Sequence, residues 1–237
     1  MIDWILANQT LFNAGISAIT VLVWILYAQL LYSGFRRQRT PRVIINRGRQ
    51  KDLNALCIIS NMSQEAIYVE FILATLKTSH GKVVMDVTDF ERSSSDVPHG
   101  ENDSSDNALA PSANLRDDTR QGPLLSGDFM HIGTFVDLAN RLAREAGIPM
   151  RGERPQGDIR FECLSIQIIA LYGPDSRPIS ATRDFHIHSD EAGTTLTPTS
   201  WATRQGVSYL HRRRLGKFVN EMNETNFSIS SSVRTEG

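Results

Sequence analysis

The feature that most constrains this chain is a long apolar run close to its N-terminus. From Trp4 to Phe35 the sequence holds no Asp, Glu, Lys, Arg or His, and its most apolar part extends from Leu11 to Tyr32. A helix rises about 1.5 Å per residue, so roughly 20 apolar residues cross the hydrocarbon core of a bilayer. The sequence therefore predicts a transmembrane helix over residues 11–34, preceded by a short extracytoplasmic tail over residues 1–10.

A buried helix and a cleaved signal peptide both fit this apolar run less well. A buried helix of a soluble domain is seldom this long without a charged residue. A cleaved signal peptide has a basic segment, then a shorter apolar stretch and a cleavage site between small residues. Residues 1–10 hold no Lys or Arg, and no convincing Ala-x-Ala follows the run. The segment is therefore predicted to be an uncleaved signal anchor.

The charges on the two sides of the run predict its orientation. Asp3 is the only charged side chain before it. The residues that follow it contain seven cations, namely Arg36, Arg37, Arg39, Arg42, Arg47, Arg49 and Lys51. Cations flanking a span favour the cytoplasmic side, so the N-terminus is expected outside and the C-terminal domain in the cytoplasm, with a bacterial inner membrane as the expected location.

The basic juxtamembrane segment, residues 35–41, and its neighbour Arg42 are expected at the membrane surface. Lys or Arg near an anionic leaflet contributes about 1 kcal/mol per residue to binding. The membrane-surface residues expected here are Arg36, Arg37, Arg39 and Arg42. Inside the span, Ala14 and Ala18 form a small-residue face and Gln29 is polar, so these three are candidate helix–helix contacts in a homo-oligomer. Lipid-facing small residues are the commoner alternative.

Beyond the anchor, the sequence predicts a mainly-β domain over residues 42–200. Alternating apolar segments are separated by turn residues, and strands are expected near residues 42, 55, 67, 83, 124–131, 159 and 181. The side chains expected to point inward are Ile67, Val69, Phe71, Leu73, Val83, Met85, Val87, Leu164, Ile166, Ile168, Phe185 and Ile187. This pattern resembles an antiparallel immunoglobulin-like β-sandwich with one or two peripheral helices. Such a fold does not define a function.

Three further segments complete the expected organisation. Residues 91–122 are acidic, rich in Ser and free of aromatic residues, so they are predicted to be a disordered insertion. A helix is expected over residues 132–146, with Asp137 and Arg141 as an i,i+4 pair. Residues 226–237 are expected to form a disordered tail.

Residues 201–225 are predicted to form a basic amphipathic helix. Its expected apolar stripe consists of Val207, Leu210, Phe218, Val219 and Met222, with Leu215 at the edge. Arg212 and Arg213 lie largely off that stripe and are the other two residues expected at the membrane surface. Packing on the sandwich and lying on an anionic bilayer both remain open for this helix.

Two residue pairs are candidates for chemistry. Cys57 and Cys163 fall in strands that a disulfide joins in antibody domains, but thiols stay reduced in the cytoplasm, and reduced cysteines are expected. His186 and His188 alternate with apolar residues and share an outward face. A zinc site there would need a third ligand, with His131, Cys163 and Asp184 as candidates. Solvent-facing histidines are the expectation, and no cofactor is predicted.

The function expected from the sequence is that of a membrane-anchored, non-catalytic interaction module with a protein partner of unknown identity. No phosphate-binding loop, Gly-x-Ser-x-Gly, His-Glu-x-x-His or Cys-x-x-Cys occurs. A net charge of −1 gives no support for a nucleic-acid partner. The alternatives are a structural subunit of a larger membrane assembly, an enzyme built on the histidine pair, or an extracytoplasmic receptor or envelope domain if the topology is inverted.

Overall fold

The computed structural model describes residues 9–38, 40–89, 119–152, 154–173, 177–190 and 193–224. The chain divides into two compact units, residues 1–40 and 41–237, and each is described by itself. The expected N-terminal tail lies almost entirely outside the described residues. So do most of the expected insertion and the C-terminal tail.

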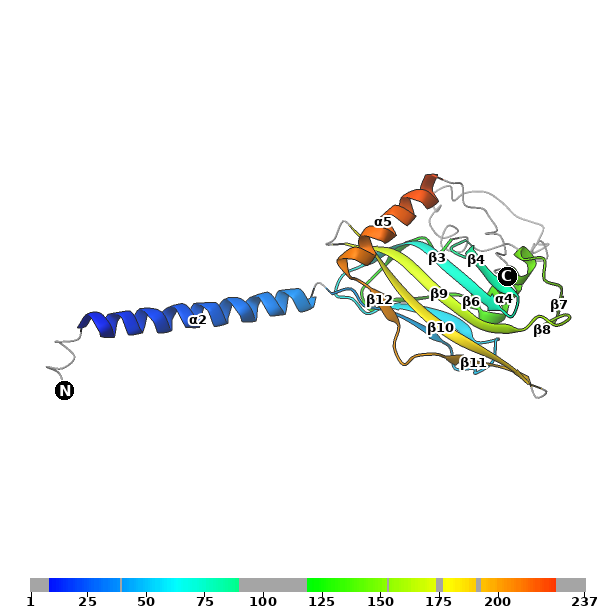
Figure 1. Ribbon diagram of the computed structural model, residues 1–237, viewed down its shortest axis with the longest axis horizontal. Helices are drawn as coiled ribbons and strands as arrows, with labels where there is room; N and C mark the ends of the chain where they lie inside the picture. Colours follow the sequence, from blue (N-terminus) through cyan, green and yellow to red (C-terminus); the bar gives the residue numbers. More distant parts are fainter. Residues whose placement is uncertain are drawn as a thin grey trace, which may run out of the picture. The chain divides into compact units, whose positions relative to one another are not determined.

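The first unit is a single helix, α2, which extends from Gln9 to Gln38. Its segment Gln9–Gly34 has a mean hydropathy of 1.9 and is long and apolar enough to cross a membrane, and none of it is buried within the protein. The helix begins before and ends after the predicted boundaries, so residues 35–38 of the juxtamembrane segment continue it. Figure 1 shows α2 as one uninterrupted helix.

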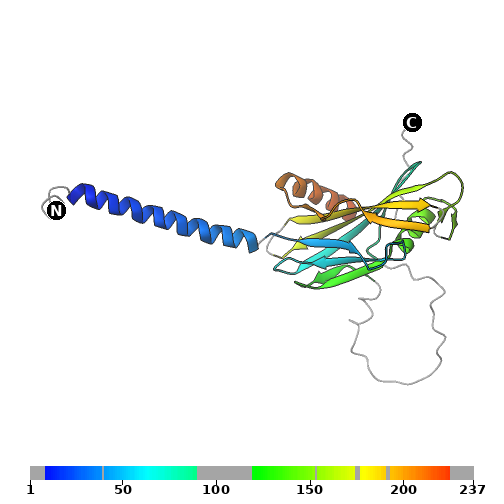
Figure 2. The same cartoon turned by 90° about the horizontal axis from the view of Figure 1, so that it is seen from below.

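The second unit is built from antiparallel β-sheets (Figures 1 and 2). The first sheet has the order β1-β2-β6, and its strands are β1 (Val43–Arg47), β2 (Leu56–Asn61) and β6 (Phe129–Thr134). The second sheet has the order β11-β10-β9-β3-β4, with β12 paired to β10 and β5 paired to β3. Its strands are β3 (Ile67–Thr78), β4 (Gly81–Asp86), β5 (Gly122–Leu124), β9 (Phe161–Tyr172), β10 (Pro178–Asp190), β11 (Gly193–Pro198) and β12 (Arg204–Gly206). A small ribbon pairs β7 (Met150–Arg151) with β8 (Arg154–Pro155).

The two large sheets share one apolar core. Buried side chains of β1, β2 and β6 meet those of β3, β9 and β10, and the rings of Phe135 and Phe185 pack edge to face at 4.7 Å between centroids. The predicted alternation of β9 and β10 is confirmed, because Leu164, Ile166 and Ile168 are buried, as are Phe185 and Ile187. The coarse prediction of an antiparallel, mainly-β domain is therefore correct, and neither sheet closes into a barrel.

Helix α4 extends from Phe135 to Glu145 and starts later than predicted. Ile132 lies in β6 rather than in the helix. Thr134 ends the strand and caps the helix, since its side chain accepts a hydrogen bond from Asp137 N–H and the Asp137 carboxylate accepts one from Thr134 N–H. The Asp137 carboxylate thus serves the cap, while the Arg141 guanidinium donates to the carbonyl of Asp89.

Strand β3 departs from the predicted alternation at its middle. Ile67 and Val69 face the core as expected, but the register with β9 shifts between Val69 and Phe71. One extra residue in a strand reverses the faces of all the side chains that follow it. Phe71 and Leu73, predicted inward, therefore lie on the outer face, and the core positions beyond the bulge are Ile72, Ala74 and Leu76.

Helix α5, from Tyr209 to Glu224, packs on that outer face and begins later than predicted. Its buried side chains are Leu215, Val219 and Met222, which contact Leu73 and Ile169. Of the predicted stripe, Val207, Leu210 and Phe218 are instead exposed. The structure therefore extends the folded domain beyond residue 200, and packing on the sheet is the observed arrangement of this helix.

Residues 119–122, which the prediction assigned to the insertion, belong to the folded domain. A β-bridge joins Asp89 to Thr119, and Gly122–Leu124 forms β5 against β3. Residues 90–118 lie outside the described residues.

Candidate interaction surface

The outer face of the second sheet divides into an apolar and a polar half. Outer face here means the face opposite the shared core. Helix α5 covers the apolar half, around Leu73 and Ile169. The strand register places three rows of polar side chains on the remaining half. The first row is Lys77, Cys163 and His186, and the second is Thr75, Ser165 and Asp184. The third is Gln167 and Thr182, beside Leu73. We call this uncovered half the polar face.

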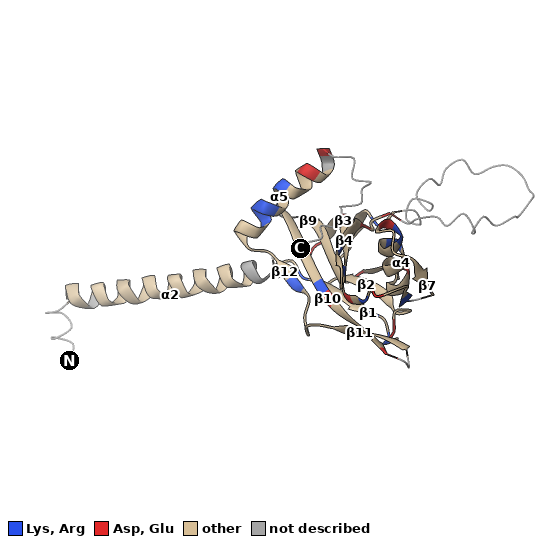
Figure 3. Cartoon of the chain, turned by 45° about the vertical axis from the view of Figure 1, so that its right-hand side comes forward, with Lys and Arg blue, Asp and Glu red and all other residues tan. Residues whose placement is uncertain are grey.

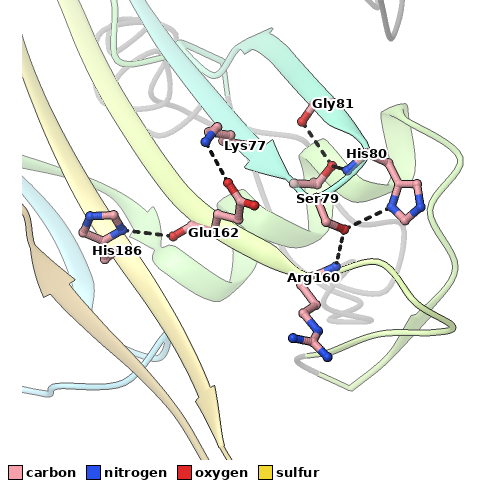
Figure 4. Close-up of polar contacts among 8 residues, drawn as sticks. Lys77, Ser79, His80, Gly81, Arg160, Glu162 and His186 are labelled. Atoms are coloured by element: carbon pink, nitrogen blue, oxygen red, sulfur yellow. Dashed lines mark hydrogen bonds and ion pairs between the residues drawn. The ribbon is translucent and has the colours of Figure 1, made fainter. Parts of the chain in front are cut away.

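At one end of the polar face lie two neighbouring groups of polar contacts, which together we call the cluster (Figure 4). The Nζ of Lys77 lies 2.8 Å from Oε2 of Glu162, and a ring nitrogen of His186 lies 3.4 Å from the Glu162 carbonyl oxygen. The Ser79 hydroxyl lies 3.0 Å from Nδ1 of His80 and accepts from Arg160 N–H at 3.1 Å. These groups come from β3, β9, β10 and the turn between β3 and β4.

The charge state of Lys77 is determined by its partner in the cluster. The hydrogen bond from Lys77 to Glu162 raises the pKa of the Lys77 ammonium, so this side chain stays charged at neutral pH. An always-protonated amine is neither a general base nor a nucleophile. Next to it, Asp184 accepts a hydrogen bond from Ser165 at 2.5 Å and pairs with Arg204 at 3.5 Å. Exposed charges of both signs thus lie side by side on a rigid sheet.

The two cysteines are free, and the antibody-like disulfide between them is not formed. Cys57 is buried in the core side of β2, while Cys163 lies half-buried on the outer face of the opposite sheet. Burial raises the pKa of both thiols, and the nearby Asp184 carboxylate adds to the rise at Cys163. Because Cys163 faces outward, the two sulfur atoms lie on different sides of the second sheet.

The zinc alternative at His186 and His188 finds no third ligand. Both side chains are exposed on the outer face of β10, as predicted, and their ring centroids are 6.4 Å apart. Across the described parts of the chain, no group of three or more His, Cys, Asp or Glu residues is placed to hold a metal ion. Cys163 lies opposite His186 in the register, and burial raises the pKa of its thiol.

The predicted membrane-surface residues are found in different settings. Arg42 and Arg213 are exposed. Arg212 is half-buried and donates to the carbonyls of Arg177 at 2.6 Å and Pro178 at 3.2 Å, so it also fastens α5 to the start of β10. The side chains of Arg36, Arg37 and Arg39 lie outside the described residues.

The predicted helix–helix contacts Ala14, Ala18 and Gln29 are all exposed on α2. Contacts between copies of the helix stay a prediction.

A serine–histidine pair was not foreseen from the sequence. The Ser180 hydroxyl lies 2.8 Å from Nε2 of His211, which joins β10 to the first turn of α5. A Cβ on Gly206 would clash with that hydroxyl and with the His211 ring, so only glycine fits there. Ser180 is buried, so this contact joins the two elements inside the fold.

A buried arginine is the other unforeseen feature. The Arg183 guanidinium donates to the carbonyls of Ile45 at 2.6 Å and of Ser200 and Trp201 at 3.2 Å each. Burial and then the neighbouring Arg47 lower its pKa, although a guanidinium remains charged at any physiological pH. No local sequence signal identifies such a residue, because its acceptors come from two distant segments.

The fold and surface define a class of protein, namely a long apolar helix followed by an antiparallel β-domain with a polar sheet face. Comparisons with protein-family models, with curated proteins and with solved structures returned no match.

Proposed function

We propose that this protein is a single-pass membrane protein whose β-domain acts as a non-catalytic interaction module in the cytoplasm. The observation that carries the proposal is the contrast between the two units. The segment Gln9–Gly34 buries none of its apolar surface within the protein, whereas the β-domain has a complete core of its own. An exposed apolar helix of this length needs an apolar surrounding, and a bilayer supplies one.

The orientation is proposed from the charges that follow the helix. Seven cations lie between Arg36 and Lys51, and one acid precedes the span. The positive-inside rule then assigns the β-domain to the cytoplasm. Free cysteines on the domain agree with a reducing compartment. The immunoglobulin-like form of the β-sandwich is part of this proposal, and so is the location in a bacterial inner membrane.

The polar face is the proposed contact with a protein partner. No described helix or strand packs on it, and its exposed Lys77, His186 and His188 sit beside Glu162 and Asp184. Charges of both signs in a fixed arrangement favour one partner orientation and disfavour mismatched surfaces. No reaction is proposed at this surface.

The test is a cross-linking pull-down from membranes with the full chain and two charge-reversal variants. Lys77→Glu removes the ammonium from the polar face, and Arg151→Glu makes the same charge reversal on an exposed residue elsewhere. The proposal predicts a partner that is lost with Lys77→Glu and retained with Arg151→Glu. A partner retained by both variants but lost when residues 1–40 are replaced by an unrelated span would instead identify a structural subunit that binds through its helix.

A further inference from the structure

One end of the β-domain is formed by the loops around the point where the chain enters it from α2. Arg42 N–H donates to the Ser63 hydroxyl at 2.8 Å, and the Arg42 carbonyl accepts from Met62 N–H at 2.8 Å. The Ser126 hydroxyl donates to the Ser63 carbonyl at 2.6 Å. These contacts join Arg42 to the loops at 62–63 and 125–128. We use the name entry end for Arg42 and these two loops together with residues 177–178 and 207–213.

The start of α5 belongs to the same end through its contacts with β10 and β12. Gly206 pairs with Ser180, and the adjacent Gln205 side chain hydrogen-bonds Val43, the first residue of β1. The Arg177 guanidinium stacks over the Tyr209 ring, 4.4 Å from its centroid. The first turn of α5 is thereby held beside the turn that precedes β10.

Several large apolar side chains at the entry end are exposed. The exposed fractions are 54% for Met62, 58% for Leu125, 59% for Tyr209 and 68% for Leu210. Scattered exposed apolar residues are normal, but several on one end of a folded domain mark a surface that contacts something. Leucine and tyrosine are also side chains that enter the interfacial region of a bilayer readily.

The charge on α5 is arranged along its axis rather than around it (Figure 3). The N-terminal half carries Arg212, Arg213 and Arg214, Lys217 lies just past the middle, and the end of the helix carries Glu221 and Glu224. This is the reverse of the arrangement that suits the helix dipole. The arrangement nevertheless concentrates cations at the entry end and keeps the two acids away from it.

The balance of charge at the entry end is positive. Its cations are Arg42, Arg177, Arg212 and Arg213. Among the described residues of these loops, the acids are Glu65 and Asp128. A surface that is apolar and cationic at once is complementary to an anionic lipid leaflet, where chains receive the apolar groups and phosphates receive the guanidinium groups.

The covalent connection between α2 and β1 indicates that the bilayer is the surface that the entry end contacts. Helix α2 ends at Gln38 and β1 starts at Val43. An extended chain advances at most about 3.6 Å per residue, so this connection spans no more than about 18 Å. If α2 crosses the membrane, as the proposed function has it, the entry end cannot move farther than that from the end of α2.

We propose that the entry end docks on the anionic headgroup surface, with Leu125, Tyr209 and Leu210 in the interfacial layer. This inference rests on the proposed membrane anchor. It also determines which end of the β-domain faces the membrane. Strand β3 starts near the entry end at Ile67, and the ten steps to Lys77 advance roughly 32–34 Å, so the cluster around Lys77 lies at the other end of the sheet from the docking residues.

The experiment uses the full chain reconstituted into liposomes, with Cys163→Ser to leave only the buried Cys57. An environment-sensitive NBD label is attached at Leu210→Cys, with a second site at Leu125→Cys. The matched control is Lys82→Cys, an exposed position paired with Lys77 at the far end of the sheet. Flotation and resistance to alkaline carbonate are measured first. Failure of either overturns the proposed anchor itself.

In liposomes with 30% phosphatidylglycerol, the labels at both entry-end sites are expected to shift to the blue. Lipid-borne quenchers should quench them at least threefold more than the label at Lys82→Cys. Arg213→Glu with Arg214→Glu, or pure phosphatidylcholine, should remove most of that difference. A protein that floats and resists carbonate, yet shows equal quenching at all three sites, overturns the docking and leaves the anchor standing. Strong quenching that is indifferent to lipid charge overturns the electrostatic part.

Discussion

The side-chain amide of Gln205 hydrogen-bonds both backbone groups of Val43, accepting from its N–H at 3.2 Å and donating to its carbonyl at 2.6 Å. The side chain thus takes the place of a neighbouring strand along the edge of β1. Thr203 does the same at Ile45, whose N–H donates to the Thr203 hydroxyl at 2.9 Å. An edge strand with paired backbone groups is protected from pairing with another chain, which matters for the strand that directly follows the anchor.

Replacing Gln205 should destabilise the domain measurably. Gln205→Ala leaves the N–H and carbonyl of buried Val43 without these partners, and an unsatisfied buried backbone group costs about 1–3 kcal/mol. Denaturant unfolding of the full chain in detergent should show that loss, and hydrogen exchange should be faster at the Val43 amide. Gln50→Ala, at an exposed position, is the control. An unchanged unfolding midpoint in Gln205→Ala would show that the β1 edge is closed by other means.

Two leucines of α5 offer a matched test of how the helix is attached. Leu215 is 6% exposed and Leu210 is 68% exposed. Leu215→Ala should lower the free energy of unfolding by about 2–5 kcal/mol, because it leaves a cavity against Leu73 and Ile169. Leu210→Ala should stay within about 0.5 kcal/mol of the parent in detergent. Equal effects of the two changes would contradict the packing of α5 on the sheet.

The reactivity of the thiols should follow their burial. Only the thiolate reacts, and partial burial with the Asp184 carboxylate raises the pKa of Cys163. Maleimide labelling of Cys163 at pH 7.5 should therefore be slower than that of free cysteine and should still be rising above pH 9, while Cys57 stays unlabelled until the protein unfolds. Asp184→Asn lowers the pKa and should speed labelling, and Asp128→Asn should not. A rate that levels off below pH 8.5 would contradict this environment.

Part of the fold could be predicted because its causes are local. The long apolar run determines α2, and the strict alternation of β9 and β10 determines which of their side chains are buried. The bulge in β3 could not be predicted, because it depends on the register with β9 rather than on the residues near Phe71. The apolar stripe predicted for α5 is partly wrong for a similar reason: β12 takes up Arg204–Gly206, so the helix begins at Tyr209 and turns a different face to the sheet.

The candidate surfaces were harder to predict from the sequence than the strands. The outward positions of His186 and His188 follow from alternation, but the row of Lys77, Cys163 and His186 requires the pairing of three strands. Arg212 was expected at the membrane surface as a charge alone, whereas the structure shows it bonded to the carbonyls of Arg177 and Pro178. Contacts between segments this far apart leave no pattern in either segment.

The measurement that tests the central proposal most directly is the topology of the full chain. A protease-sensitive tag is placed after Gly237, and intact spheroplasts are digested with and without permeabilisation. The proposed function predicts that the tag is protected until the membrane is permeabilised, which assigns the β-domain and its polar face to the cytoplasm. Digestion in intact spheroplasts would contradict it, reverse the orientation drawn from the arginines after α2, and make an extracytoplasmic receptor or envelope domain the better proposal.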